Sequence, residues 1–505
     1  MILKIYDSKY LIKVLIYCYV IINILLFLIS TYGFFSGAGN LTTISGIFYL
    51  IISTLLSLHK RFYEGPFSLL FSFNTLIFFN IPLAFILIEG ENYKFGDGLA
   101  AVPYSYNEYA QNLWLGLLYL SILWISIWAA LVSIPYKKIK LSQFSLSKIS
   151  NARIIALGFI VLIVTFFDNI RIINVNIEKV EKLFNIFSFI LFDHAYLLIT
   201  GIIIYIKINN SGLFNTNRNR DTLKIGSLIF ISFMILSFLS GSKGAILVIF
   251  IIFVLIQLAF SMSYIDANVF GPSKLTVFML IIFAPAIFYL ALLQRINVAT
   301  ANLPLFEIYY SGISKIDLDL VPDVLSQILY RLSWGGLDRF ILIFQSFIFE
   351  DFNFEFTIHF IIYLFKNMLN LILPGTLFSE AYYPSSQFYP EVLSKNFIES
   401  DGDYLALMSS FNTQAYTIYG IFIILFGLIA PFFLYLFTLI LVLIFNKVNS
   451  ILIRASILYF WIMSLSSYGI EVAIGNSAHV FLSMLLMFII TYKFFKFNIA
   501  LSRIN

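Results

Sequence analysis

Three arginines and an aspartate in the second half of the chain have the chemistry to hold a phosphate-bearing ligand. Arg295 directly follows an apolar stretch, Arg331 and Arg339 are eight residues apart, and Asp338 precedes Arg339. A planar guanidinium binds diphosphate through paired hydrogen bonds, which suits a lipid-diphosphate head group at a membrane surface. The alternative is that these arginines anchor the chain among lipid head groups and pair with neighbouring acids. Residue spacing leaves both interpretations open.

A short glycine-containing turn offers a second cation. Lys243 lies in Ser240-Gly241-Ser242-Lys243-Gly244, between two apolar stretches. Glycine allows a ligand to approach the backbone closely, and a lysine there can pair with phosphate. The alternative is a plain hairpin turn between two helices.

Histidines and acids near the predicted outer side could serve in proton transfer. His359 and His479 can act as a general base near neutral pH, and Glu471, close to His479 in sequence, is another candidate. Each could instead have a structural role.

Asp193 and His194 are adjacent in the middle of an apolar stretch. Ionisable groups inside a membrane are costly and usually face a polar cavity. This pair could line the substrate cavity of an enzyme, form a proton-coupled site in a transporter, or pack as a neutral hydrogen-bonded pair.

The composition indicates the environment of these residues. The chain has 505 residues, 61% of them hydrophobic and 11% charged, whereas a soluble domain carries about 25% charged residues. We therefore expect an integral membrane protein, not a nucleic-acid binder or a disordered regulator. The single cysteine, Cys18, excludes a disulfide scaffold. Phosphate-loop, zinc-peptidase, serine-hydrolase and C-x-x-C motifs are missing from the sequence, which argues against an ATP-driven pump and predicts neither a metal nor a cofactor.

The apolar segments predict an all-α polytopic protein. A helix needs about 20 apolar residues to cross the hydrocarbon core. This criterion gives about 12 transmembrane helices, near 11–30, 41–58, 67–89, 112–134, 152–167, 183–206, 224–240, 244–261, 275–293, 417–445, 452–470 and 479–498.

The charges between these spans predict their direction. Placing the N-terminus in the cytoplasm puts 20 of the 31 basic residues, Lys137 and Arg454 among them, in the cytoplasmic loops with only four of the 26 acids. Because basic residues accumulate on the cytoplasmic side, we expect both termini to be cytoplasmic.

One connection is far longer than the others. The 123-residue external segment 294–416 carries 13 acids and six bases and separates a nine-span region, 1–293, from a three-span region, 417–505. It contains two apolar stretches, 337–349 and 356–373. If both crossed the membrane, the acidic linker between them would be cytoplasmic without a basic residue. We therefore predict helices that lie on the outer leaflet or re-enter it.

This layout resembles the bacterial O-antigen and oligosaccharide repeat-unit polymerases, which have about 12 spans, both ends inside and one large periplasmic loop. The turn at 240–245 is similar to the Gly-Ser-Arg-Gly turn of that family, with Lys243 where arginine is usual. Residues 411–420 are similar to the beginning of the family's next span. Arg295 and Arg331 occur where the family tends to place arginines.

The resemblance implies metal-independent, inverting glycosyl transfer on the periplasmic face of the bacterial inner membrane. A glycan on undecaprenyl diphosphate would be moved onto the next lipid-linked repeat unit, with membrane lipid as surroundings, no nucleic acid as partner and a chain-length regulator left open. The implied diphosphate ligands are Arg295, Arg331, Arg339 and Lys243. The implied bases are His359, Asp338 or Glu471, and the sugar-stacking residues are Trp334, Tyr382 and Tyr383. Asp193 and His194 would line the cavity.

Three other functions stay open. An O-antigen ligase shares the layout, but its loop typically carries a histidine motif, and His359 lies in an apolar stretch without the expected polar neighbour. A lipid-linked oligosaccharide flippase should have short loops and a charged cavity. A solute transporter would rely on Asp193 and His194.

Overall fold

The structure, a computed structural model, describes residues 8–63, 65–93, 113–138, 262, 326, 329–330, 332–348, 354–372, 417–448 and 451–465. Every regular element in these ranges is a helix, as the all-α prediction requires. The chain divides into two compact units, and almost all described residues belong to the one formed by Lys13–Lys137 and Leu325–Ser477. The predicted division into 1–293, 294–416 and 417–505 stays a prediction.

Among the described residues, five helical runs are long and apolar enough to cross a membrane. They are Val14–Phe34, Asn40–Ser57, Pro66–Asn92, Leu113–Ser133 and Ile418–Lys447. These runs match the predicted spans near 11–30, 41–58, 67–89, 112–134 and 417–445. The other spans, except the one near 452–470, lie outside the described residues, so the total of about 12 and the cytoplasmic termini stay predictions.

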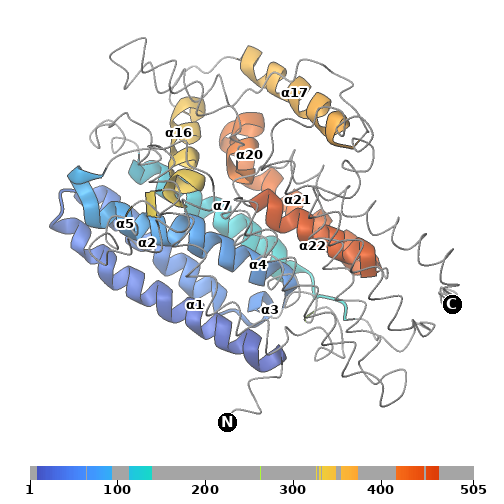
Figure 1. The fold of residues 1–505 in the computed structure, drawn as a ribbon, viewed down its shortest axis with the longest axis horizontal. Helices are drawn as coiled ribbons and strands as arrows, with labels where there is room; N and C mark the ends of the chain where they lie inside the picture. The colour runs from blue at the N-terminus through green and yellow to red at the C-terminus, as the bar shows by residue number, and fades with distance from the viewer. Residues whose placement is uncertain are drawn as a thin grey trace, which may run out of the picture. The chain divides into compact units, whose positions relative to one another are not determined.

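The elements that build these runs can be followed in Figure 1. They are α1 (Ser8–Ser30) with η2 (Thr31–Phe34), α2 (Asn40–Ser57), α4 (Pro66–Thr75), η3 (Leu76–Asn80), α5 (Ile81–Glu89), η4 (Gly90–Asn92), α7 (Leu113–Ser133), α20 (Ile418–Phe426), η9 (Gly427–Ile429) and α21 (Ala430–Lys447). The short α3 (Lys60–Tyr63) follows α2, and α22 (Ile451–Leu465) falls in the predicted span near 452–470.

Two of these five runs are interrupted within their length. The third contains a π-helical turn, η3, between α4 and α5. The tenth predicted span breaks at Gly427, whose φ of +54° is a conformation that glycine adopts without strain. Backbone groups freed by such breaks need internal partners inside a membrane. The Tyr119 hydroxyl on α7 supplies one, because it donates to the Gly427 carbonyl oxygen over 2.8 Å.

Large aromatic side chains fill the core of the bundle. Helix α7 packs beside α2 and α21, and α4 packs beside α22. Trp124 is fully buried and its ring lies 5.1 Å from that of Phe71. Trp461 on α22 is also fully buried and donates from Nε1 to the Phe67 carbonyl oxygen over 3.1 Å. Burial of aromatic surface and these indole contacts tie α4, α7 and α22 together.

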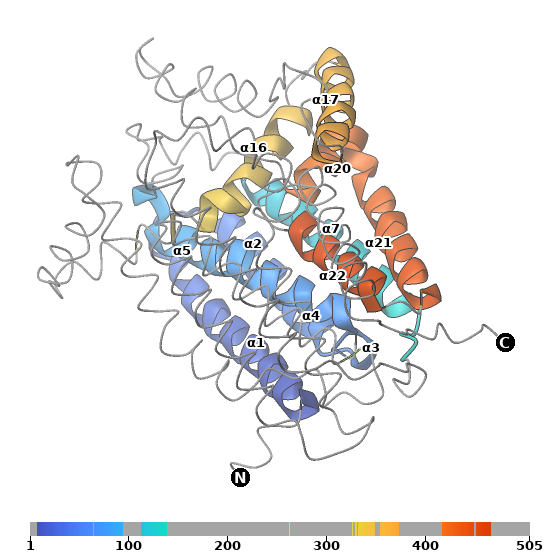
Figure 2. The same ribbon diagram turned by 45° about the vertical axis from the view of Figure 1, so that its right-hand side comes forward.

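Both apolar stretches of the predicted loop are helices, α16 (Leu337–Ile348) and α17 (Phe354–Ile372). Residues 337–344 of α16 are all buried, and in both views the helix lies between α5 and α20 (Figures 1 and 2). Twelve residues reach about 18 Å, too short for a hydrocarbon core of about 30 Å. Of the two predicted placements, this burial fits a helix that enters the bundle and not one that lies on its surface.

Helix α17 has a different environment. Phe360 and Tyr363 are buried, while Ile361, Ile362 and Phe365 are exposed. An exposed apolar face of this kind is suited to contact with lipid, as the predicted position of α17 at the membrane surface requires. That position stays a prediction.

Predicted loops of the same side meet at the same end of the bundle. At one end, Ser36 donates to the Leu87 carbonyl oxygen over 2.6 Å and accepts from the Glu91 backbone N–H. At the other end, the buried Arg454 side chain donates to the carbonyl oxygens of Val448, over 2.7 Å, and Lys137. Ser36 and Glu91 lie in predicted external loops, and Lys137 and Val448 lie in predicted cytoplasmic loops.

Candidate functional site

Asp338, in the first turn of α16, lies at the centre of a buried hydrogen-bond cluster. The Tyr93 hydroxyl donates to Asp338 Oδ2 over 2.7 Å, and the Ser333 hydroxyl donates to Asp338 Oδ1 over 2.9 Å. The two hydroxyl oxygens are themselves 2.7 Å apart. Asp338 and Ser333 are fully buried, and Tyr93 is 1% exposed. We call these three residues the carboxylate cluster.

An interruption of the helical backbone at Gly336, just before α16, brings Ser333 and Asp338 together. The Gly336 N–H donates to the Ser333 carbonyl oxygen over 3.1 Å, closing a turn, and the first turn of α16 follows. A Cβ atom on Gly336 would collide with the carbonyl oxygen of Phe78, which belongs to the π-helical turn η3. The glycine therefore lets the backbone of this turn lie directly against the broken third span.

Tyr93 is placed by the end of the same span. It follows the single turn η4 and its N–H donates to the Gly90 carbonyl oxygen over 3.0 Å. Gly90 has a φ of +52°, and a Cβ atom there would collide with the Ser36 carbonyl oxygen. The loop after η2 thus fixes the turn that directs Tyr93 toward α16.

Aromatic rings surround the carboxylate cluster. The ring of Tyr93 stacks on that of Tyr330, with centroids 5.4 Å apart. Phe85 on α5 packs edge-on against both tyrosines, at 5.9 Å and 4.9 Å. These contacts orient the Tyr93 hydroxyl and exclude water from it.

Arg339 brings a positive charge next to the cluster. Its Cζ atom lies 5.5 Å from the ring centroid of Trp334, within the range of a cation–π interaction. Arg339 is 6% exposed and Trp334 3% exposed. The arrangement holds a guanidinium, a carboxylate and two hydroxyls within one buried region at the beginning of α16.

The pKa of Tyr93 is raised well above its usual value of 10.0. Burial of the phenol is the main cause, and the negative charge of Asp338 adds to it. Tyr93 therefore remains protonated at physiological pH and keeps donating to Asp338.

Four of the residues predicted from the sequence can be located. Asp338, Arg339 and Trp334 lie together at the beginning of α16, whereas His359 is exposed on α17. The other predicted site residues lie outside the described residues: Arg295, Arg331, Lys243, Glu471, His479, Tyr382, Tyr383, Asp193 and His194. Within the described ranges, no three His, Cys, Asp or Glu side chains gather as metal ligands.

Sequence reasoning missed Tyr93, Ser333, Tyr330 and Phe85. Tyr93 is 245 residues before Asp338 in the chain, and no spacing pattern relates the two. Two consecutive glycines, Gly335 and Gly336, are a local signal for an interrupted helix, but the contact of Gly336 with Phe78 of the third span has no such signal.

The chain matches no family model, no curated protein and no solved structure. Functional inference therefore depends on the geometry above and on the sequence.

Proposed function

We propose that the protein is a membrane glycosyltransferase that polymerises undecaprenyl-diphosphate-linked repeat units into O-antigen or capsular polysaccharide. The observation that carries this proposal is the Asp338–Arg339 pair. It begins a helix that enters a bundle of membrane-crossing segments, beside the end of the third span. A carboxylate and a guanidinium in that environment suit a reaction that combines a sugar hydroxyl with a lipid diphosphate.

The proposed reaction needs a base and a cation. A hydroxyl of the acceptor repeat unit attacks the anomeric carbon of the growing glycan, and the bond between that carbon and the diphosphate oxygen breaks with inversion. The hydroxyl proton passes to a base, and the lipid diphosphate leaves with the bonding electrons. Arg339, with Arg295 and Arg331 of the predicted loop, would neutralise the charge that develops on the diphosphate.

Among the three candidate bases, Asp338 has a distinct environment. Both of its oxygens already accept hydrogen bonds from Tyr93 and Ser333. We assign Asp338 a positioning role, in which it would orient a substrate hydroxyl or the side chain of Arg339. His359 and Glu471 stay the candidates for proton removal. An exposed histidine on α17 could reach a substrate from the surface of the bundle.

The test is the length distribution of surface polysaccharide on gels. We expect deletion of the gene to leave one repeat unit on the lipid core, and the wild-type gene to restore the ladder. Arg339→Ala should fail to restore it despite normal amounts of protein in the membrane, while Arg61→Ala, at an exposed arginine on α3, should restore it. An unchanged ladder after deletion would remove the protein from this pathway.

A second function, transport of the lipid-linked oligosaccharide, is favoured by one observation. The third and tenth predicted spans are both interrupted, and many transporters build their substrate sites from discontinuous helices. In that case deletion would remove every repeat unit from the surface, and lipid-linked single units would accumulate on the cytoplasmic side. Accumulation of lipid-linked polymer in the periplasm would instead indicate a ligase.

A further inference from the structure

Seven neutral polar side chains meet in the interior of the bundle, away from the carboxylate cluster. They come from α1, α2, the third span and α20, and each is at most 5% exposed. We call them the polar centre: Tyr19, Asn23, Tyr49, Ser53, Thr75, Asn80 and Tyr419.

Contacts between these side chains make them one group. Asn80 Nδ2 donates to Asn23 Oδ1 over 2.7 Å and is 3.5 Å from Ser53 Oγ. The Tyr19 hydroxyl lies close to the same three side chains, outside hydrogen-bonding geometry. The hydroxyls of Tyr49 and Tyr419 continue the group. The polar centre thus connects three separate spans and α20.

Five atoms of the polar centre are buried without a hydrogen-bond partner among the residues that the structure describes. They are the hydroxyl oxygens of Tyr19, Tyr49 and Thr75, the Asn23 amide nitrogen and the Asn80 amide oxygen. Hydrocarbon offers no hydrogen bonds, so unsatisfied groups at this place in the bundle would be strongly unfavourable. Something other than these side chains must satisfy them.

The polar centre surrounds the irregular turn of the third span. Thr75 directly precedes the π-helical turn η3 and Asn80 is its last residue, and such turns are frequent at functional sites. The Phe78 carbonyl in the same turn lies against Gly336, where α16 begins. One turn therefore contacts both the polar centre and the helix that carries Asp338.

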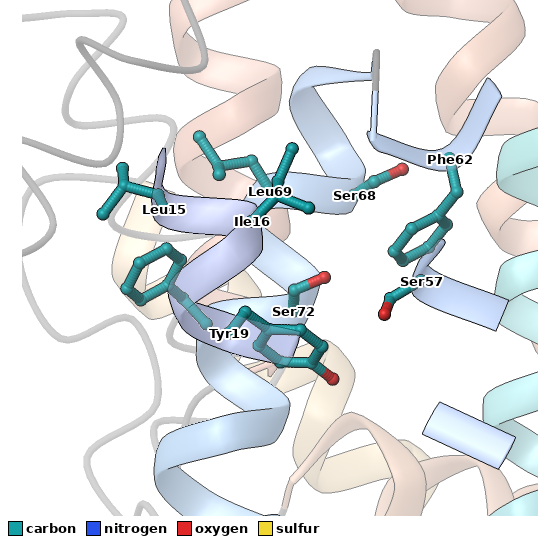
Figure 3. A pocket seen from close by; sticks show the side chains of 9 residues that line it. Leu15, Ile16, Tyr19, Ser57, Phe62, Ser68, Leu69 and Ser72 are labelled. Carbon is teal, nitrogen blue, oxygen red and sulfur yellow. The ribbon is translucent and has the colours of Figure 1, made fainter. Parts of the chain in front are cut away.

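A small pocket adjoins the polar centre at Tyr19. Tyr19 lines it together with Ser57, Ser68 and Ser72, and Figure 3 shows these hydroxyl-bearing side chains around the pocket. The free volume is about 10 Å³, close to what one water molecule needs. The Ser68 hydroxyl is also buried without a partner within the described part of the chain.

We propose that the polar centre is a site for internal water, which hydrogen-bonds to its buried unsatisfied groups. The unsatisfied groups include an amide that only donates, an amide oxygen that only accepts and hydroxyls that do both. Water can serve all of them, whereas a cation cannot satisfy the Asn23 amide and an anion cannot satisfy the Asn80 oxygen. No member of the polar centre is charged, and the adjoining pocket accommodates nothing larger. The bound water would support η3, and through it the position of α16.

The test is pulsed hydroxyl-radical footprinting of the full-length protein in lipid nanodiscs, in ¹⁸O-labelled water. Radicals form from bound water as well as from bulk water, so a buried tyrosine next to water is oxidised. We expect Tyr19 and Tyr49 to be modified several-fold more than Tyr93, although all three are at most 3% exposed. Tyr93 is the matched control because its hydroxyl is bonded to Ser333 and Asp338. Protection of Tyr19 and Tyr49 equal to that of Tyr93 would overturn the proposal.

A variant tests whether the water lies at the polar centre. Asn80→Leu keeps the approximate shape of the side chain and removes both amide groups, so oxidation of Tyr19 should fall to the level of Tyr93. Unchanged oxidation of Tyr19 in this variant would contradict the assignment. If Asn80→Leu does not fold, Thr75→Val with Tyr49 as the reporter makes the same comparison, with the same two outcomes. Neither result depends on which reaction the protein catalyses.

Discussion

Among single side chains, Asp338 connects more of the candidate site than any other described residue. Its carboxylate accepts from a hydroxyl at the end of the third span and from another just before α16. Hydrogen bonds to a buried charged group are stronger than those between neutral groups. Asp338 therefore fixes α16 to the third span as well as supplying a charge.

Replacing Asp338 by asparagine should weaken this attachment. The amide keeps the size of the side chain but is neutral and has one acceptor oxygen instead of two, so both hydroxyls lose a charged partner and one of them loses its acceptor. We expect the free energy of unfolding to fall by about 2 kcal/mol, measured by thermal or chemical unfolding in detergent. Glu91→Gln, at an exposed carboxylate near the same end of the bundle, should unfold like the wild type. Equal stabilities of the two variants would show that Asp338 does not hold α16.

The raised pKa of Tyr93 predicts how stability depends on pH. Tyrosine in an unfolded chain releases its proton near pH 10, whereas burial and the charge of Asp338 hold the proton on Tyr93 in the folded chain. Its contribution to stability is thus fully present below about pH 10 and is lost as the pH rises above that value. Tyr93→Phe cannot ionise, so its melting temperature should fall less between about pH 9 and pH 11 than that of the wild type. Parallel curves would contradict this role.

At the level of elements, α16 fits into the bundle because three glycines leave room for it. A Cβ atom on Gly116 or Gly420 would lie 2.5 Å from the terminal methyl group of Ile341 or Ile343, and one on Gly336 would collide with the Phe78 carbonyl oxygen. Side-chain ends can rotate away, but a backbone carbonyl within a helical run cannot. The three positions should therefore tolerate alanine differently.

Gly336→Ala should be the more damaging of two matched substitutions. We expect it to lower the free energy of unfolding by roughly 3 kcal/mol, and Gly116→Ala by about 1 kcal/mol, because Ile341 can adjust. Both are measured by unfolding in detergent. A shorter side chain at position 341 tests the value for Gly116→Ala. Ile341→Val should lower the free energy of unfolding less in the Gly116→Ala background than in the wild type. A Gly336→Ala variant as stable as Gly116→Ala would exclude the close contact with Phe78.

The helices themselves could be read from the sequence, but their interruptions could not. Hydropathy averaged over about 20 residues detects an apolar run, and it located the five described spans within a few residues. It does not report hydrogen-bond register, so the π-helical turn at Leu76–Asn80 was not predicted. Gly427 and Pro431 could have indicated a break, but in a long apolar stretch the span of 417–445 was predicted as continuous.

For the whole molecule, a set of contacts joins the loops at each end. At the predicted cytoplasmic end, Asn446 donates to the Pro135 carbonyl oxygen over 3.1 Å and accepts from the Lys137 N–H over 3.0 Å. Arg454 adds its bonds to Val448 and Lys137. The structure agrees with charge alternation in placing these loops together, while the side of the membrane on which they lie is a prediction.

Because the chain has a single cysteine, labelling of introduced cysteines can show on which side of the membrane these loops lie. In a Cys18→Ser background, a cysteine at Phe35, which is 83% exposed, should react with a membrane-impermeant maleimide in intact spheroplasts. A cysteine at the exposed Lys138 should react only after the membrane is opened. The reverse pattern would invert the predicted orientation, and labelling of both positions in intact spheroplasts would contradict the arrangement of the spans between them.

The candidate site could be predicted only in part because its members are far apart in the chain. Asp338, Arg339 and Trp334 are neighbours in sequence, so the composition of one segment was enough to single them out. Tyr93 joins them through folding alone, across 245 residues. Long-range hydrogen bonds leave no trace in local spacing, which is why the acid was predicted but its partners were not.

The helices that bury α16 are synthesised at different times. Helix α16 packs against α7, made earlier, and against α20, which begins at Ile418 and is made later. When Arg339 is added to the growing chain, Tyr93 and Ser333, the partners of Asp338, have already been made. The apolar side of α16 has to wait longer, because Ile343 packs on Gly420 and Phe340 on Tyr419, roughly 80 residues later in the chain. Chains terminated before that point would leave Phe340 and Ile343 without these contacts.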